Sequence, residues 1–275
     1  MNRRLKYLSR IHEDFDTVIC GVNGVILSGE NVVSSSLDVL IKLYQNNKNI
    51  CIASNSSLRV WDLYKLLKHK GVPMEIFSAM VTAGEVAHFY LKNETSLGNA
   101  YYNLAQHASN VAQGLPYRAT DSLVLADFII AETDDCGFLS EKYYPQLEQA
   151  LQLRLPLLCV GNDVTVISSG ESKINAGAVA EQYAMMGGKI IPFGKPDVRM
   201  ISYLTEDIAN FDGKRCLVVG DCMSTDIRMG NNFGTKTLFL TDGVHQLHDN
   251  VETQLEDLAE HYGLRVDYYT EDLQW

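Results

Sequence analysis

Short apolar runs alternate with helical patterns along most of this chain. A β-branched run spans Thr17 to Cys20, and a second apolar run spans Ile50 to Ala53. Between them, apolar side chains recur at helical spacing from Leu37 to Tyr44, after serines at 34–36 that can cap a helix. Strands that alternate with helices in this way predict an α/β protein with parallel strands and right-handed crossovers.

Local signals mark where two further helices end and begin. A helix through Leu63 and Leu67 should end at Gly71, because glycine is the common residue after a helix C-terminus. Thr82 and Glu85 have the spacing of a capping box, which predicts that a helix begins there.

The alternation continues to the C-terminus. Further strands are expected at residues 128–131, 157–160, 216–219 and 237–240, and further helices at residues 143–153 and 176–186. The segment between Met80 and Ile190 either continues one sheet or forms a second α/β module, and periodicity does not decide between them.

Composition and charge narrow the function classes. Hydrophobic residues make up 46% and charged residues 21% of the chain, as in soluble globular proteins. The net charge of −11 disfavours binding to nucleic acid or to anionic membranes. No apolar run has the length of a membrane span, and no signal-peptide core follows the basic N-terminus. The six cysteines form no CxxC pair, so we expect reduced thiols and a cytosolic, cytoplasmic protein.

Polar segments follow the predicted strands, where ligands bind in parallel sheets. These segments are residues 20–25, 54–56, 194–196 and 220–226. Ser54 and Asn55 offer hydrogen-bond donors to phosphate oxygens, and Lys195 offers a positive charge. Asp221 and Asp226 are hard oxygen ligands suited to Mg²⁺. Each segment alone is typical of an ordinary loop, but together they predict a phosphate site.

With these segments, the chain resembles the haloacid dehalogenase (HAD) superfamily, in its class IIA branch of NagD-like phosphatases. The resemblance rests on residues 15–20 with 24–25, 54–56, 194–196 and 220–227, and on residues 161–163, 176–178 and 187–189 in the middle of the chain. It implies a Rossmann-like core, with a parallel sheet and helices on both faces, at residues 1–78 and 190–275. It also implies an inserted α/β cap of the C2 type at residues 79–189.

The resemblance also implies an activity. Members hydrolyse small phosphomonoesters, such as sugar or nucleotide phosphates, with Mg²⁺ and through an aspartyl phosphate. In this chain Ser54, Asn55 and Lys195 would bind phosphate. Asp221, Asp226 and the backbone carbonyl of Asn23 would hold Mg²⁺. Members of the branch often pair through the cap, which implies a homodimer.

Two positions depart from the family pattern. Gly21 stands where the nucleophilic Asp is expected, and Asn23 stands where the acid/base is expected. Neither residue can perform the expected chemistry, and Mg²⁺ should bind more weakly with fewer carboxylates. Asp16 precedes the strand that Gly21 follows, so about 13 Å of strand should separate it from the site.

Three interpretations remain open for the site. In the first, hydrolysis is lost and the protein binds a small phosphorylated metabolite or a partner. In the second, a metal-bound water held by Asp221 and Asp226 supports weak hydrolysis. In the third, the fold is a structural or interaction module. We favour the first, because the residues expected to bind an anion are retained.

Several other polar residues have two interpretations. Asn162 and Asp163 either contact substrate from the cap or form a turn. Glu132, Asp134 and Asp135 form an acidic loop that either binds a metal or is solvated, and we expect it to be solvated. Arg59 could reach an anion and His245 could line the pocket, but both are expected at the surface.

Overall fold

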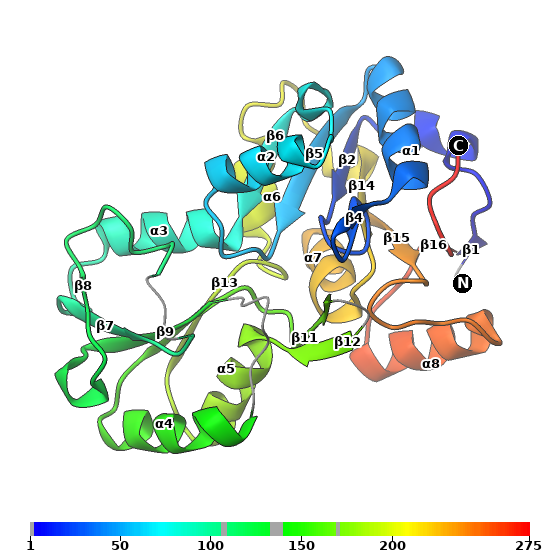
Figure 1. Cartoon of the computed structure of the whole chain (residues 1–275). Coiled ribbons are helices and arrows are strands. Elements are labelled where there is room, and N and C mark those ends of the chain that lie inside the picture. The colour runs from blue at the N-terminus through cyan, green and yellow to red at the C-terminus, as the bar shows by residue number, and fades with distance from the viewer. Residues whose placement is uncertain (1–2, 106–108, 133–139, 169–170) are drawn as a thin grey trace. The chain divides into compact units, whose positions relative to one another are not determined.

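The computed structural model describes residues 3–105, 109–132, 140–168 and 171–275 (Figure 1). The chain divides into two compact units. Unit 1 consists of Met1–Ser54, Tyr64–Val81 and Lys195–Trp275, and unit 2 consists of Asn55–Leu63 and Thr82–Gly194. In the described part of the chain, no helix has both the length and the hydropathy required to cross a membrane.

Unit 1 is built on a seven-stranded sheet with the order β1-β16-β15-β14-β2-β5-β6. The strands are β1 (Arg3–Arg4), β2 (Thr17–Cys20), β5 (Asn49–Ser54), β6 (Ala79–Thr82), β14 (Cys216–Gly220), β15 (Lys236–Leu240) and β16 (Tyr268–Thr270). The central strand β2 is buried along its whole length, as expected for a parallel strand with both faces covered. Its parallel register places Cys20 beside Val219 of β14, so the two strands end side by side.

Helices cover the sheet of unit 1 on both faces (Figure 1). They are α1 (Ser34–Gln45), α2 (Val60–His69, which straddles the two units), α6 (Arg199–Thr205), α7 (Arg228–Phe233) and α8 (Val251–Tyr262). Shorter elements are the 3₁₀ turns η1 (Leu8–Arg10), η2 (His12–Asp14), η3 (Met74–Ile76) and η5 (Gly213–Arg215), and the hairpin of β3 (Leu27–Ser28) and β4 (Asn31–Val32). A π-helical turn, η6 (Met223–Ile227), follows β14. Such turns are frequent at functional sites.

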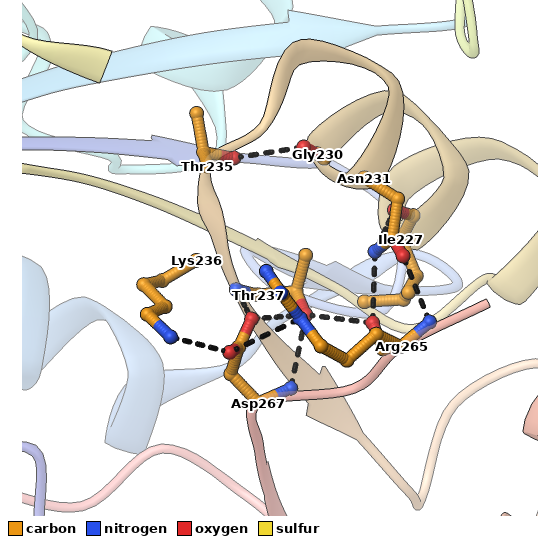
Figure 2. A network of polar contacts seen from close by, with 8 residues as sticks. All are labelled: Ile227, Gly230, Asn231, Thr235, Lys236, Thr237, Arg265 and Asp267. Atoms are coloured by element: carbon orange, nitrogen blue, oxygen red, sulfur yellow. Dashed lines mark hydrogen bonds and ion pairs between the residues drawn. The ribbon is translucent and has the colours of Figure 1, made fainter. Parts of the chain in front are cut away.

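A polar network fastens the chain before β16 to the amino end of β15 (Figure 2). Asp267 accepts hydrogen bonds from the Lys236 ammonium at 2.7 Å and from the Thr237 amide at 3.1 Å. The Asn231 side chain donates to the carbonyl of Arg265 at 2.8 Å and accepts from its amide at 2.8 Å. These contacts hold α7, β15 and β16 together at the edge of the sheet opposite to the carboxyl ends of the strands.

Unit 2 contains a second parallel sheet with the order β13-β10-β9-β7-β8. Its strands are β7 (Ala100–Asn103), β8 (Arg118–Ala119), β9 (Phe128–Glu132), β10 (Leu157–Val160) and β13 (Ile190–Phe193). The other elements are α3 (Ala83–Asn93), η4 (Leu123–Leu125), α4 (Ser140–Gln152), α5 (Ala176–Met185) and the antiparallel pair of β11 (Thr165–Ser168) and β12 (Glu171–Ile174).

Alternate residues of the unit 2 strands face two different hydrophobic clusters. Ile130 and Leu158 pack in the cluster that includes α3, whereas Ile129 and Leu157 pack in the cluster that includes α4 and α5. This alternation follows from the two-residue period of a strand. The second sheet is therefore covered by helices on both faces.

Most predicted elements are confirmed. The strand predicted at residues 157–160 has those same bounds in β10. The Thr82 hydroxyl accepts a hydrogen bond from the Glu85 amide at 2.9 Å, so the predicted helix cap forms. Gly71 follows α2 with a positive φ of 88°, as the predicted helix end requires.

The bounds of the two units differ from the predicted ones at both junctions. Residue 79 is expected to begin the cap, but β6 lies beside β5 in the sheet of unit 1. Residue 190 is expected to begin the second segment of the core, but β13 pairs with β10 inside the sheet of unit 2. Unit 1 therefore resumes at Lys195. An apolar strand alone does not show which of two parallel sheets it joins, because its pattern is the same in both.

Candidate functional site

The candidate site of unit 1 begins where β2 and β14 end. The amide of Gly21 donates a hydrogen bond to the carbonyl of Val219 at 3.1 Å, which continues the pairing of the two strands. Gly21 and Gly220 therefore leave the sheet at the same edge, and each opens a polar loop.

Lys195 and Asp226 form a buried ion pair in unit 1. The Lys195 ammonium donates to Oδ1 of Asp226 at 2.7 Å, and the two side chains are 7% and 4% exposed. Asp226 reaches this position from η6. Burial strengthens the attraction within such a pair but also makes the loss of either partner costly.

Gly21 faces this ion pair. A Cβ atom at Gly21 would lie 3.4 Å from Oδ1 of Asp226, 3.5 Å from the Lys195 ammonium and 3.7 Å from the carbonyl oxygen of Asn23. These are ordinary contact distances, so a side chain would fit. Gly21, which is predicted to stand at the nucleophile position, thus lies beside Lys195 and Asp226, but its side chain is only a hydrogen atom.

Glycines also surround Asp221. Oδ2 of Asp221 accepts a hydrogen bond from the Val244 amide at 2.9 Å. A Cβ at Gly24 or at Gly243 would lie 2.1 Å from an Asp221 side-chain atom, which is a steric clash. Gly24 also has a positive φ of 76°, which favours glycine. The two glycines therefore make the space that the Asp221 carboxylate occupies.

The donors at this site suit a hard divalent cation. Asp221, Asp226 and the Asn23 carbonyl would supply oxygen ligands of the kind that Mg²⁺ prefers. Residues 3–105, 109–132, 140–168 and 171–275 contain no group of three His, Cys, Asp or Glu side chains that could hold a metal. These donors fit Mg²⁺. They include two side-chain carboxylates, whereas the family pattern has a further carboxylate at position 21.

Cys20 precedes Gly21 and carries the nearest thiol in the sequence. Burial raises the pKa of this thiol to about 12, and its sulfur lies 3.6 Å from the Cys51 carbonyl as a hydrogen-bond donor. The thiolate is the nucleophilic form of cysteine. Cys20 is therefore a neutral thiol at pH 7 and not a nucleophilic thiolate.

The other predicted site residues divide between the units. Ser54, at the end of β5 in unit 1, is buried. Asn55 lies in unit 2, where its amide donates to Oδ1 of Asp163 at 3.0 Å. The Asn162 amide donates to the carbonyl of Phe193 at 3.1 Å. Asn162 and Asp163 thus hold loops together at the carboxyl ends of the unit 2 strands, and substrate contact by them stays a prediction.

Asp16 lies away from the site, as predicted. It makes a two-pronged ion pair with Arg215, and its pKa is lowered mainly by that hydrogen bond. The carbonyl of Asp16 accepts from the amide of Asn49, at the start of β5. Asp16 therefore stands at the amino end of the sheet and cannot serve as the nucleophile.

The expectation that Glu132 is solvated was wrong. Glu132 is fully buried and accepts hydrogen bonds from the Asn103 amide at 3.4 Å, the Val111 amide at 3.3 Å and the Ser109 hydroxyl. Arg59 and His245 are partly exposed, and each has a polar partner: Arg59 pairs with Glu85 at 2.7 Å, and His245 accepts from the Met223 amide. Asp134 and Asp135, predicted in the same loop as Glu132, lie outside the described residues.

Comparisons with known proteins agree with this architecture. A model of haloacid dehalogenase-like hydrolases matches residues 18–117, and a second one, described as HAD-hydrolase-like, matches residues 192–274. The chain is 28% identical over 280 residues to a glycerol-3-phosphate phosphatase of Gallus gallus, covering 94% of this chain and 89% of that protein.

Solved structures share the fold. A haloacid dehalogenase-like hydrolase from Brucella suis 1330 superimposes with a TM-score of 0.84 at 22% identity, covering 99% of this chain and 100% of that one. NagD from E. coli K-12 superimposes with a TM-score of 0.62 at 19% identity, covering 94% of this chain and 96% of that one. The solved structures show that this chain has the fold of NagD. The two family models, which match residues 18–117 and 192–274, show that this protein belongs to the haloacid dehalogenase-like hydrolases.

Proposed function

We propose that this protein binds a small phosphomonoester at the strand ends of unit 1 and does not hydrolyse it through an aspartyl phosphate. The observation that carries the proposal is Gly21, whose Cβ position lies within 3.5 Å of both Lys195 and Asp226. The groups suited to hold a phosphate remain, while the atom that would attack phosphorus is missing.

Lys195 is the main anchor for the phosphate in this proposal. An ammonium group carries three donors, so it can keep its bond to Asp226 and still donate to a phosphate oxygen. Ser54, at the end of the neighbouring strand β5, adds a hydroxyl and a backbone amide. Bound Mg²⁺ would neutralise phosphate charge, held by Asp221, Asp226 and the Asn23 carbonyl, and weakly because carboxylates are missing.

The loss of turnover follows from covalent chemistry. Removing the nucleophile of a hydrolase can lower kcat on the order of 10⁶-fold. The Asn23 amide cannot deliver a proton to a leaving alcohol as a carboxylic acid does. This chain therefore lacks the nucleophile that would attack phosphorus and the acid that would protonate the leaving alcohol.

Glycerol 3-phosphate is the first ligand to test, because the name of the relative from Gallus gallus specifies it as a substrate of that protein. The experiment is calorimetric titration with glycerol 3-phosphate and with inorganic phosphate, each with and without Mg²⁺. Phosphate binding without Mg²⁺ that is lost in the double variant Lys195→Met with Asp226→Asn, shown by circular dichroism to be folded, would support the proposal. Absence of binding by the wild type would refute it and favour a structural or interaction module.

A second candidate is weak hydrolysis by a metal-activated water. The presence of both Asp221 and Asp226 favours it, because two carboxylates can hold a metal ion that activates water. Slow phosphate release that requires Mg²⁺ and that Asp221→Asn abolishes would support this candidate over binding alone.

Unit 2 is proposed to act as the cap and to pair two copies of the chain, as in other members of the branch. The acidic net charge of −11 supports a small-molecule ligand over nucleic acid or a membrane surface, and we propose a cytoplasmic location. Light scattering of the purified protein measures the predicted dimer, and a monomer at micromolar concentration would refute it.

A further inference from the structure

The loop between β15 and α8 makes two hydrogen bonds to the segment that carries the site aspartates. The Val244 amide donates to Oδ2 of Asp221 at 2.9 Å. One residue later, Nε2 of His245 accepts from the Met223 amide at 3.3 Å. The loop therefore donates one hydrogen bond to the Asp221 carboxylate and accepts one from the backbone amide of Met223.

Met223 is the first residue of η6, the turn that presents Asp226. The first amides of a helical turn have no partner inside the turn and need an acceptor from elsewhere. Cys222, which precedes the turn, does not cap it with its side chain. The His245 ring supplies the acceptor from a different element, and so it acts as a cap on the turn.

The surroundings of His245 keep its ring in the accepting form. Its ring centroid lies 5.8 Å from that of Phe239 and 6.3 Å from that of Tyr262. Burial lowers the pKa of the imidazole below its ordinary value, so the ring is neutral at pH 7. Because Nε2 accepts, the proton of the neutral ring is assigned to Nδ1.

We propose that His245 is a positioning residue that holds Asp221 and Asp226 in register for the ligand of this site. The inference rests on the proposed function, since it concerns the same site. His245 caps η6 directly, and through its neighbour Val244 the same loop holds Asp221. One short loop thereby ties the two aspartates to each other.

The alternative is that His245 only fills space between Phe239 and Tyr262. Two variants separate these roles. His245→Phe keeps a ring against its two aromatic neighbours but removes the acceptor. His245→Gln loses the ring but offers an oxygen acceptor near the position of Nε2.

The test measures amide hydrogen exchange of Met223 by NMR and inorganic phosphate binding with Mg²⁺ by calorimetry. In His245→Phe we expect Met223 exchange to accelerate at least about tenfold and phosphate to bind about tenfold more weakly. In His245→Gln both values should return to within about threefold of the wild type, even if the melting temperature falls with the lost ring.

Effects that are larger in His245→Gln than in His245→Phe would follow ring packing and would overturn the proposal, as would unchanged Met223 exchange in both variants. The exchange measurement needs no ligand. If wild-type protein binds no phosphate, the proposed function fails, and the exchange data still decide whether His245 caps the turn.

Discussion

Replacing Lys195 with methionine should strongly destabilise unit 1. The change keeps the length of the side chain but removes the ammonium that lies 2.7 Å from Oδ1 of Asp226. Asp226 is 4% exposed, so water cannot take over the lost interaction. Breaking a buried ion pair from one side costs about 3–5 kcal/mol, because a buried charge remains without its partner.

The assay is urea unfolding at pH 7, followed by circular dichroism. The double variant Lys195→Met with Asp226→Asn removes both charges and should recover at least about half of the lost stability, since an uncharged pair needs no compensation. Lys214→Met, at an exposed lysine, serves as the control and should change the unfolding free energy by no more than about 0.5 kcal/mol. A Lys195→Met cost below about 1 kcal/mol, or a double variant as unstable as the single one, would refute the reasoning.

Three further predictions address the site loop, the buried acid of unit 2 and the pH dependence of stability. Gly243→Ala would place a Cβ 2.1 Å from the Asp221 side chain, so Mg²⁺ affinity, measured by calorimetry, should fall at least about tenfold. Glu132→Leu leaves the Ser109 hydroxyl and two amides without their acceptor and should cost about 2–5 kcal/mol in urea unfolding, whereas Glu132→Gln should cost less; equal costs would contradict this. Burial lowers the pKa of His88 below its ordinary 6.5, so the unfolded chain binds the proton more tightly, and this contribution to stability is lost as pH falls below about 6.5. The melting temperature should therefore depend less on pH in His88→Gln, and an unchanged dependence would contradict the assignment.

The strands and the positions of the site loops follow from the sequence because they depend on local pattern. The run Thr17–Cys20 is buried on both faces, so its apolar composition specifies a central strand directly. Parallel strands end at a common edge, and this alone predicts that Gly21 and Asp221 leave the sheet close together.

The contacts made across long sequence separations did not follow from the sequence. Glu132 ends a strand in front of two aspartates, which suggested a solvated loop. Its partners Ser109 and Val111 come from a segment more than twenty residues earlier. When the hydrogen-bond donors of a buried carboxylate lie far away in the sequence, the residues around it look the same as those around an exposed carboxylate.

His245 is a similar case. Its local sequence is that of a polar loop, and nothing nearby shows that the ring is enclosed by Phe239 and Tyr262. The sequence contains one indication that this loop is packed closely. Gly243 follows the end of β15, and a glycine at such a place often leaves room for another group to approach the backbone. In this structure the Asp221 side chain occupies that room.

The central claim is that two missing carboxylates, at Gly21 and Asn23, separate this chain from a working phosphatase. The most direct measurement is phosphate release from glycerol 3-phosphate with Mg²⁺, by the wild type and by Gly21→Asp with Asn23→Asp, side by side. A Cβ introduced at Gly21 would meet only ordinary contacts, so the variant should fold and turn over while the wild type stays at background. Turnover by the wild type that Asp221→Asn abolishes, or an inactive but folded double variant, would contradict the account.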